Sequence, residues 1–68
     1  MNTELIFARI ETLTDNPDFP ALFWVSPNTI KTWRRRKNIP AQSVIDVAIG
    51  NGWSIDYLAY GYQPVIAA

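Results

Sequence analysis

The stretch VSPNTIKTWRRRKNI, residues 25–39, limits the possible folds of this chain more than any other segment. The hydroxyl of Ser26 can accept a hydrogen bond from the free amides of a helical first turn, and Pro27 loses no hydrogen bond at the first helical position. Together these two residues form a helix start signal. The sequence therefore predicts a helix from about Pro27 to Lys37.

The predicted helix 27–37 has an apolar side and a cationic side. Ile30 and Trp33 fall on the same side, because they are three residues apart on a helix that turns about 100° per residue. The other side carries Asn28, Lys31, Thr32 and Arg35. Five of the six basic residues of the chain lie in this segment, namely Lys31, Arg34, Arg35, Arg36 and Lys37. The pattern suits a helix that enters the major groove of DNA, although cations at a helix C-terminus also favour the helix dipole without any partner.

Composition excludes several classes of protein. The 68 residues suffice for one small domain without an enclosed substrate chamber. Six acidic residues balance six basic ones, so attraction to phosphate can come only from a local concentration of charge. Cysteine and histidine are absent, which removes disulfides, the commonest zinc ligands and the usual general base. We therefore expect no enzyme, no cofactor, no metal and no small-molecule substrate.

Hydropathy bears on the location of the protein. No apolar run approaches the roughly 18 residues that a membrane span needs. The N-terminus lacks the basic and apolar regions of a secretory signal. We expect a cytoplasmic protein without membrane contact.

The first half of the chain predicts two more helices. Residues 3–14 form one, with an apolar stripe of Ile6, Phe7, Ile10 and Leu13 and with Asn2 or Thr3 as its cap. Two prolines in the segment TDNPDFP break this helix. A short second helix over residues 19–24 is capped by Asp18, and its expected buried residues are Ala21, Leu22 and Val25. Phe23 and Trp24 are adjacent, so one of them is expected to be exposed.

The second half predicts a fourth and a fifth helix. Residues 41–50 follow Pro40 and carry Ala41, Val44, Ile45, Ala48 and Ile49 at helical spacing. The sequence Gly50-Asn51-Gly52 is a stop signal. Ser54 caps a fifth helix that extends to Tyr60 and ends at Gly61, with Trp53 placed to pack against Leu58. The predicted fold class is all-α, a compact bundle of about five short helices.

Domain boundaries follow from this pattern. Residues 1–61 form one helix-turn-helix domain, and residues 62–68, YQPVIAA, form an apolar tail without helical periodicity. Three interpretations of the tail stay open. It lies along the body of the protein, pairs with a second copy as a dimer arm, or begins a linker to a further domain.

Two motifs resemble a known family. The segment VSPNTIKTWRRRKNIP resembles the pattern VSxxTIxxWxxRxxIP of the N-terminal domain of phage CI-type repressors, which is a lambda-repressor-like DNA-binding domain. The segment GNGWSIDYLAYG resembles the pattern xxGxSxDWLxxG at the end of the same domain. The two segments span residues 25–61 with matching separation. The resemblance implies a sequence-specific transcriptional regulator from a phage or mobile element, bound to double-stranded DNA in the bacterial cytoplasm and associated with the nucleoid.

Two residues depart from the helix-turn-helix pattern. The family usually has a small residue at the position of Pro20 and a glycine in the turn at the position of Trp24. Either the helix before the turn is shorter than in relatives, or Trp24 packs outward and the turn is reshaped. Both alternatives affect the angle of the helix 27–37.

The resemblance assigns roles to residues of the helix 27–37. Val25, Ile30 and Trp33 look like the residues that fix the helix by packing. The positions that read bases or contact flanking phosphates are those of Ser26, Asn28, Lys31, Thr32 and Arg35. Those that look like DNA-backbone contacts are Thr29, Arg34, Arg36 and Lys37. One such helix neutralises few phosphates, so we expect a homodimer on operator half-sites about 34 Å apart.

Several alternatives remain from the sequence. The chain is either a fragment of a longer regulator or a small stand-alone protein of Cro type. A protein-binding helical module, such as an antitoxin or anti-repressor, would instead use Phe23, Trp24, Tyr60 and Tyr62. An excisionase-like architectural protein would be distinguished by bending its DNA.

Overall fold

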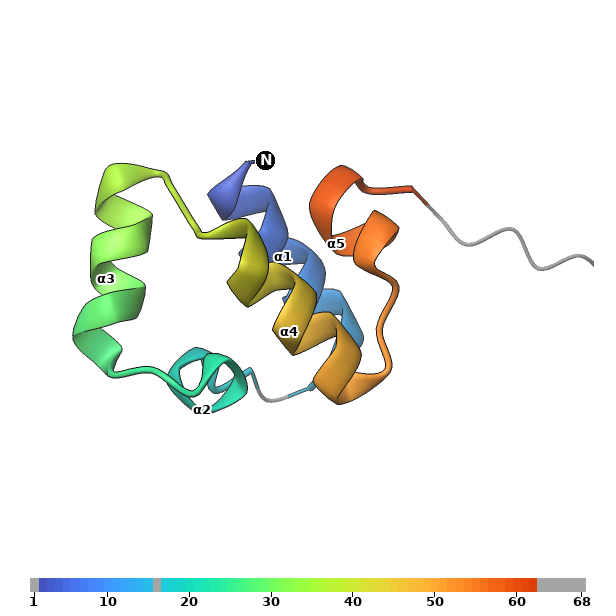
Figure 1. Cartoon of the computed structure of the whole chain (residues 1–68), viewed down its shortest axis with the longest axis horizontal. Coiled ribbons are helices and arrows are strands. Elements are labelled where there is room, and N and C mark those ends of the chain that lie inside the picture. The colour runs from blue at the N-terminus through green and yellow to red at the C-terminus, as the bar shows by residue number, and fades with distance from the viewer. Residues whose placement is uncertain (1, 16, 63–68) are drawn as a thin grey trace, which may run out of the picture.

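In the computed structural model, which describes residues 2–15 and 17–62, the chain folds into five short helices (Figure 1). The helices are α1 (Thr3–Leu13), α2 (Phe19–Phe23), α3 (Pro27–Arg36), α4 (Ala41–Asn51) and α5 (Ile55–Tyr60). No strand occurs within the described ranges. The predicted all-α bundle of about five helices is confirmed.

Side-chain chemistry starts four of the five helices. The side chains of Asn2, Asp18, Ser26 and Ser54 each accept a hydrogen bond from an amide of the first turn. α4 instead begins after Pro40, which has no capping hydrogen bond. The predicted caps are confirmed, and of the two candidates at the start of α1 it is Asn2 that caps.

Four helices end at a residue in the left-handed conformation. These residues are Trp24, Lys37, Gly52 and Gly61. The two glycine stops are confirmed. The predicted helices 3–14, 19–24 and 27–37 each end one residue earlier than expected, because their last predicted residue has already left the helical conformation. The predicted helix 41–50 runs one residue further, to Asn51.

The helices surround a central pair. α1 and α4 run through the middle of the molecule, with α3 on one flank and α5 on the opposite flank (Figure 1). α3 packs against α1 and α2, whereas α5 packs against α1 and α4. α2 also packs against α4. The consequence for function is that α3 is held from one side and keeps its other side free.

One core joins all five helices. Its largest fully buried apolar side chains are Ile6, Phe7, Ile10, Val44, Val47 and Leu58. The ring of Phe7 makes edge-to-face contacts with Phe19 and Phe23, at centroid distances of 4.7 and 5.9 Å. The predicted stripe of α1 is confirmed for Ile6, Phe7 and Ile10. Leu13 was expected in it but is exposed, because α1 ends at this residue.

The predicted buried side of α2 is wrong in part. Ala21 is exposed, and Leu22 and Val25 are only half-buried against the core. Phe23 is instead the buried residue of α2, because its ring fits between those of Phe7 and Trp33. Trp24 is 70% exposed, which confirms that one of the two adjacent aromatics points outward.

The predicted buried side of α4 is rotated from the observed one. Val44 and Ala48 are buried as expected, whereas Ile45 is half-buried and Ala41 and Ile49 are exposed. Val47 is fully buried although it was not expected to be. The cause is that α4 has apolar residues on two neighbouring sides, and the packed helices cover only the side of Val44, Val47 and Ala48.

The last helix and its flanks agree with the sequence. Trp53 is half-buried and packs against the core, to which Leu58 belongs; the direct contact between these two residues stays a prediction. Tyr62 is exposed, and its ring centroid lies 5.7 Å from that of Tyr60. Beyond this residue the predicted tail lies outside the described residues, so its three interpretations stay predictions.

Candidate nucleic-acid interface

The start of α3 is fixed by its own sequence. Oγ of Ser26 accepts from the amide of Thr29 at 3.3 Å and shares a hydrogen bond with Oγ1 of Thr29 at 3.1 Å. Pro27 occupies the first turn, where its missing N–H leaves no gap. The start signal Ser26-Pro27 therefore places the helix as predicted, with both hydroxyls exposed or half-exposed at its N-terminal end.

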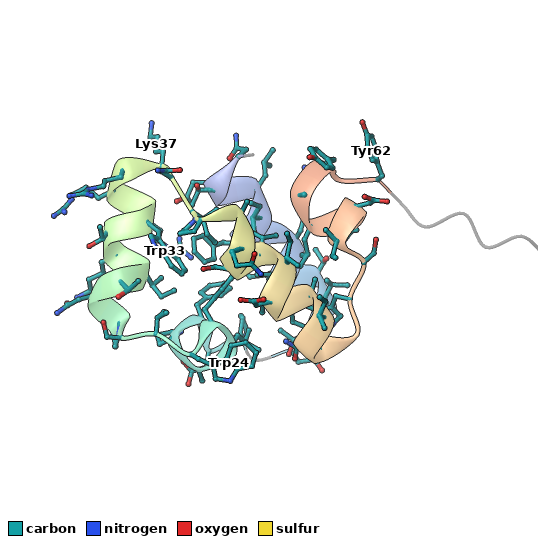
Figure 2. The ribbon with its side chains drawn as sticks, in the orientation of Figure 1. Trp24, Trp33, Lys37 and Tyr62 are labelled. Atoms are coloured by element: carbon teal, nitrogen blue, oxygen red, sulfur yellow. The ribbon has the colours of Figure 1, made fainter. Side chains whose placement is uncertain are left out.

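The inner side of α3 is anchored by two apolar residues. Ile30 is 6% exposed and belongs to the core. Trp33 packs against the core and makes an edge-to-face contact with Phe23 at a centroid distance of 5.5 Å. Figure 2 shows the Trp33 side chain pointing from α3 toward the body of the protein. These contacts fix which side of α3 faces solvent.

The outer side of α3 carries polar and cationic side chains. Asn28, Lys31 and Arg35 are exposed, and Thr32 beside them is half-buried. At about 100° per residue these four positions lie within one sector of the helix, opposite Ile30 and Trp33. The row contains one amide, one hydroxyl and two cations, which together can donate to or accept from the edges of bases.

The flanks of this row hold four more of the predicted site residues. Ser26 and Thr29 lie at the N-terminal end, with their hydroxyls joined as described. Arg36 is exposed in the last turn. Lys37 follows α3 in the left-handed conformation (φ 53°) and is seen at the end of this helix in Figure 2. It lines an open cleft with Asn2, which caps α1, and with Thr3 and Glu4. Lys37 is thus exposed beside the N-terminus of α1.

Arg34 is the predicted site residue that the structure does not bring into this row. It follows Ile30 by four residues, so it lies on the inner side of α3. Its guanidinium carbon is 4.3 Å from the ring centroid of Phe7, and Nη1 is 3.4 Å from Oε2 of Glu4. Arg34 therefore contacts α1, whereas Arg35 and Arg36 extend into solvent.

The region before α3 accommodates Pro20 and Trp24, the two residues that depart from the helix-turn-helix pattern. Pro20 lies in the first turn of α2, where proline is tolerated. Trp24 has φ 55° and ψ 41°, the left-handed conformation that glycine adopts without steric cost. Its side chain lies over Gly50 of α4 and not within the core (Figure 2). The outward packing of Trp24 is observed, and tryptophan here occupies a conformation suited to glycine. Whether the turn is reshaped, and whether α2 is shorter than in relatives, stay predictions.

Sequence patterns missed the residues that hold the far end of α3. Thr3 is buried, and its Oγ1 accepts from the amide of Ile39 at 3.1 Å, between α3 and α4. Glu4 contacts Arg34. The residues joined by each contact are 30 or more positions apart in the sequence, so local periodicity indicates neither contact. The sequence offers only the presence of a threonine at the predicted start of the first helix.

The described part of the chain also bears on metal-binding, membrane and protein-binding functions. No group of three or more acidic residues able to hold a metal ion occurs there. None of the described helices is long and apolar enough to cross a membrane. Phe23, one of the four aromatic residues expected on a protein-binding surface, is buried, so that part of the alternative interpretation is wrong.

Comparison with known proteins adds an independent observation. The family model described as "Bacteriophage CI repressor helix-turn-helix domain" matches residues 18–65, which is more than half of the chain. The matched range begins at the cap of α2 and includes α3, α4 and α5. Neither the curated proteins nor the solved structures gave a match.

Proposed function

The chain belongs to the bacteriophage CI repressor helix-turn-helix family and is thus a DNA-binding regulatory domain; we propose that it recognises specific operator sequences through α3. The observation that carries the proposal is the two-sided construction of α3. Ile30 and Trp33 hold its inner side, and the opposite side presents a row of polar and cationic side chains that are exposed except for the half-buried Thr32. A rigid polar row of this kind can enter the major groove of DNA.

The proposed base contacts follow from the chemistry of the row. Lys31 and Arg35 can donate to O6 and N7 of guanine, and Asn28 can pair with adenine in both directions. The methyl group of Thr32 suits that of thymine. Flanking contacts to bases or phosphates come from Ser26, Thr29, Arg36 and Lys37. Arg34 faces α1, and the proposed DNA-facing set does not include it.

Two copies per operator complete the proposal. The exposed cations of one α3 are few, so a single copy binds weakly and loses affinity steeply with salt. Two copies on half-sites about 34 Å apart would combine their contacts. The second copy is recruited either by a further domain of a longer regulator or directly, as in a stand-alone protein of Cro type. The site of action is the cytoplasm of a bacterial host, on its DNA.

The decisive experiment is selection of bound sequences from a random pool of DNA duplexes. An enriched half-site supports sequence recognition, and a palindromic pair of half-sites supports two copies. An unenriched pool with salt-sensitive binding would favour an architectural role, which a DNA-bending assay then tests. Absence of binding to any duplex at low salt would overturn the proposal in favour of a protein-binding module. The exposed Trp24, Tyr60 and Tyr62 are the surface to examine in that case.

Substitutions in the row test the individual contacts. We expect Lys31→Ala or Arg35→Ala to weaken binding to the selected site by about 1–3 kcal/mol and to relax the preference at one base pair. Neither change should affect thermal unfolding by more than about 0.5 kcal/mol, because both side chains are exposed. Titration of the selected duplex and of single-base variants provides the measurement.

Arg9→Gln is the matched control. Arg9 is the sixth basic residue of the chain and contacts Leu58 of α5, on the flank opposite α3. Its loss changes the net charge by the same amount as Arg35→Ala. Base preference should survive this change, and equal preference for all bases in an Arg9→Gln protein that unfolds like the wild type would mean that residues outside α3 take part in reading bases.

A further inference from the structure

Arg34 differs from its neighbours in the arginine run. Its guanidinium carbon lies 4.3 Å from the ring centroid of Phe7 and 5.3 Å from that of Phe19. Both distances fall within the range in which a cation is attracted to the face of an aromatic ring. Glu4 adds a hydrogen-bonded ion pair at 3.4 Å. The Arg34 side chain is 38% exposed, so most of its surface is covered by the protein itself.

The contact of Arg34 with Phe7 holds the part of α3 that has no apolar anchor. Ile30 and Trp33 anchor the middle of the helix, but its last turn consists of three arginines and has no apolar side chain to bury. Without a contact there, the residues of α3 that follow Trp33 would be held only through the chain that continues to α4. The planar guanidinium group of Arg34 lies over the Phe7 ring, so this arginine packs against the protein as well as carrying charge.

Phe7 is a firm support for this contact. It is 1% exposed and is locked by the rings of Phe19 and Phe23. Because the Phe7 ring is held in place, the Arg34 side chain packed on it fixes the position of α3 relative to α1. Because Arg35 is the next residue along the helix, a rotation of α3 that displaced Arg34 would move Arg35 across the outer side.

We propose that Arg34 is a positioning residue that sets the rotation of α3 against α1, and that it does not contact the DNA backbone. The proposal rests on the proposed function, because it concerns how the same row of side chains is aimed at DNA. It divides the arginine run into two roles. Arg34 holds the helix, and Arg35 and Arg36 face the ligand.

The test compares Arg34→Gln with Arg36→Gln in the whole chain. Each variant removes one charge from the last turn of α3. Affinity is measured for the selected operator and for a random duplex at several salt concentrations. A residue that contacts phosphate contributes about 1 to the slope of log K against log salt concentration. We expect Arg36→Gln to lower the slope by about 1 and to weaken both duplexes alike.

Arg34→Gln should behave differently. We expect the slope to be unchanged, the affinity for the random duplex to be nearly kept, and the affinity for the operator to fall by about tenfold, within the range expected when one base contact is lost. In the free protein, the guanidinium protons of Arg34 should resonate upfield, because the guanidinium carbon lies over the Phe7 ring at 4.3 Å from its centroid. Arg34→Lys, which keeps the charge but not the planar head, should lose operator preference without a change of slope.

The outcomes separate the two proposals. A wild-type chain that binds no duplex overturns the proposed function, and the positioning role with it. A wild-type chain that binds, together with a slope lowered by about 1 in Arg34→Gln, overturns the positioning role alone. Full operator preference in a folded Arg34→Lys protein would also overturn it. Should Arg34→Gln fail to fold, Arg34→Lys and the proton shifts of the wild type decide the question.

Discussion

Trp24 shows how a residue that departs from the helix-turn-helix pattern is accommodated in the turn before α3. A left-handed backbone costs a residue with a Cβ about 1–2 kcal/mol relative to glycine. Trp24 adopts it with φ 55°, and its ring lies so close to Gly50 that a Cβ there would be 3.0 Å from Cη2. The contact between ring and glycine offsets part of the backbone cost. The absence of a side chain at Gly50 in α4 thus leaves room for the large Trp24 side chain from the turn.

Two substitutions at position 24 separate the ring from the backbone. Trp24→Ala and Trp24→Gly both remove the ring, but only glycine relieves the left-handed strain. We expect the glycine variant to be more stable than the alanine variant by about 1 kcal/mol in urea denaturation. Alanine and glycine substitutions at the exposed Glu11 within α1 serve as the control. There we expect the opposite result, with Glu11→Ala more stable than Glu11→Gly by about 1 kcal/mol. An alanine variant at position 24 as stable as the glycine variant would contradict the assigned conformation.

Gly61 allows a similar comparison with Gly52. Both glycines have positive φ, 78° and 70°, so alanine strains the backbone at either position. A Cβ on Gly61 would also lie 2.8 Å from Nη2 of Arg9, whereas one on Gly52 meets nothing within 4 Å. Arg9 would have to move, and its hydrogen bond to the carbonyl of Leu58 would be lost. We expect Gly61→Ala to destabilise the protein by about 1 kcal/mol more than Gly52→Ala does.

The Arg9→Ala background provides the check on this prediction. With the arginine removed, the two alanine substitutions should have equal effects on the midpoint of thermal unfolding, because only backbone strain remains. A difference that persists in this background would have another origin.

At the scale of elements, the connection between α3 and α4 depends on the first turn of α1. The amide of Ile39 donates to the buried hydroxyl of Thr3 at 3.1 Å, and the Ile39 side chain joins the core. Thr3→Val keeps the shape and leaves this amide without a partner. We expect a loss of about 1–3 kcal/mol in the free energy of unfolding.

Hydrogen exchange gives a local measurement of the same contact. The Ile39 amide should exchange rapidly in Thr3→Val and stay protected in Thr3→Ser, which retains the hydroxyl. Because this connection directly follows Lys37, operator binding should also weaken in Thr3→Val. Unchanged protection of the Ile39 amide in Thr3→Val would show that its partner lies elsewhere.

At the scale of the whole molecule, the sequence predicted the helices better than their contacts. Ser26-Pro27, Asp18, Ser54 and Gly61 act within one turn, so their effect can be recognised locally. Which apolar side of α4 is buried depends on where other helices pack, and the choice between Val47 and Ile49 could not be made from spacing. The same holds for the site: the outer row of α3 follows from helical periodicity, but the contact of Arg34 with Phe7 requires α1 to be in place.

The salt dependence of binding reflects the whole molecule, because its net charge is zero. The proposed DNA-facing set contains four cations, Lys31, Arg35, Arg36 and Lys37. If each neutralises one phosphate, the slope of log K against log salt concentration is about −3 to −4 for one copy on a half-site. Two copies on half-sites about 34 Å apart should give about twice that slope.

Duplexes that carry the selected half-site once or twice provide the measurement, with the number of bound copies determined by sedimentation. Moving one half-site by half a helical turn, about 17 Å, places the two copies on opposite faces of the DNA and serves as the control. Binding should then return to two independent events, each with the slope of a single copy. A single half-site that already gives the larger slope would mean that cations other than these four contact the DNA. Arg9 would be the next residue to test, since it is the one basic residue of the sequence outside residues 31–37.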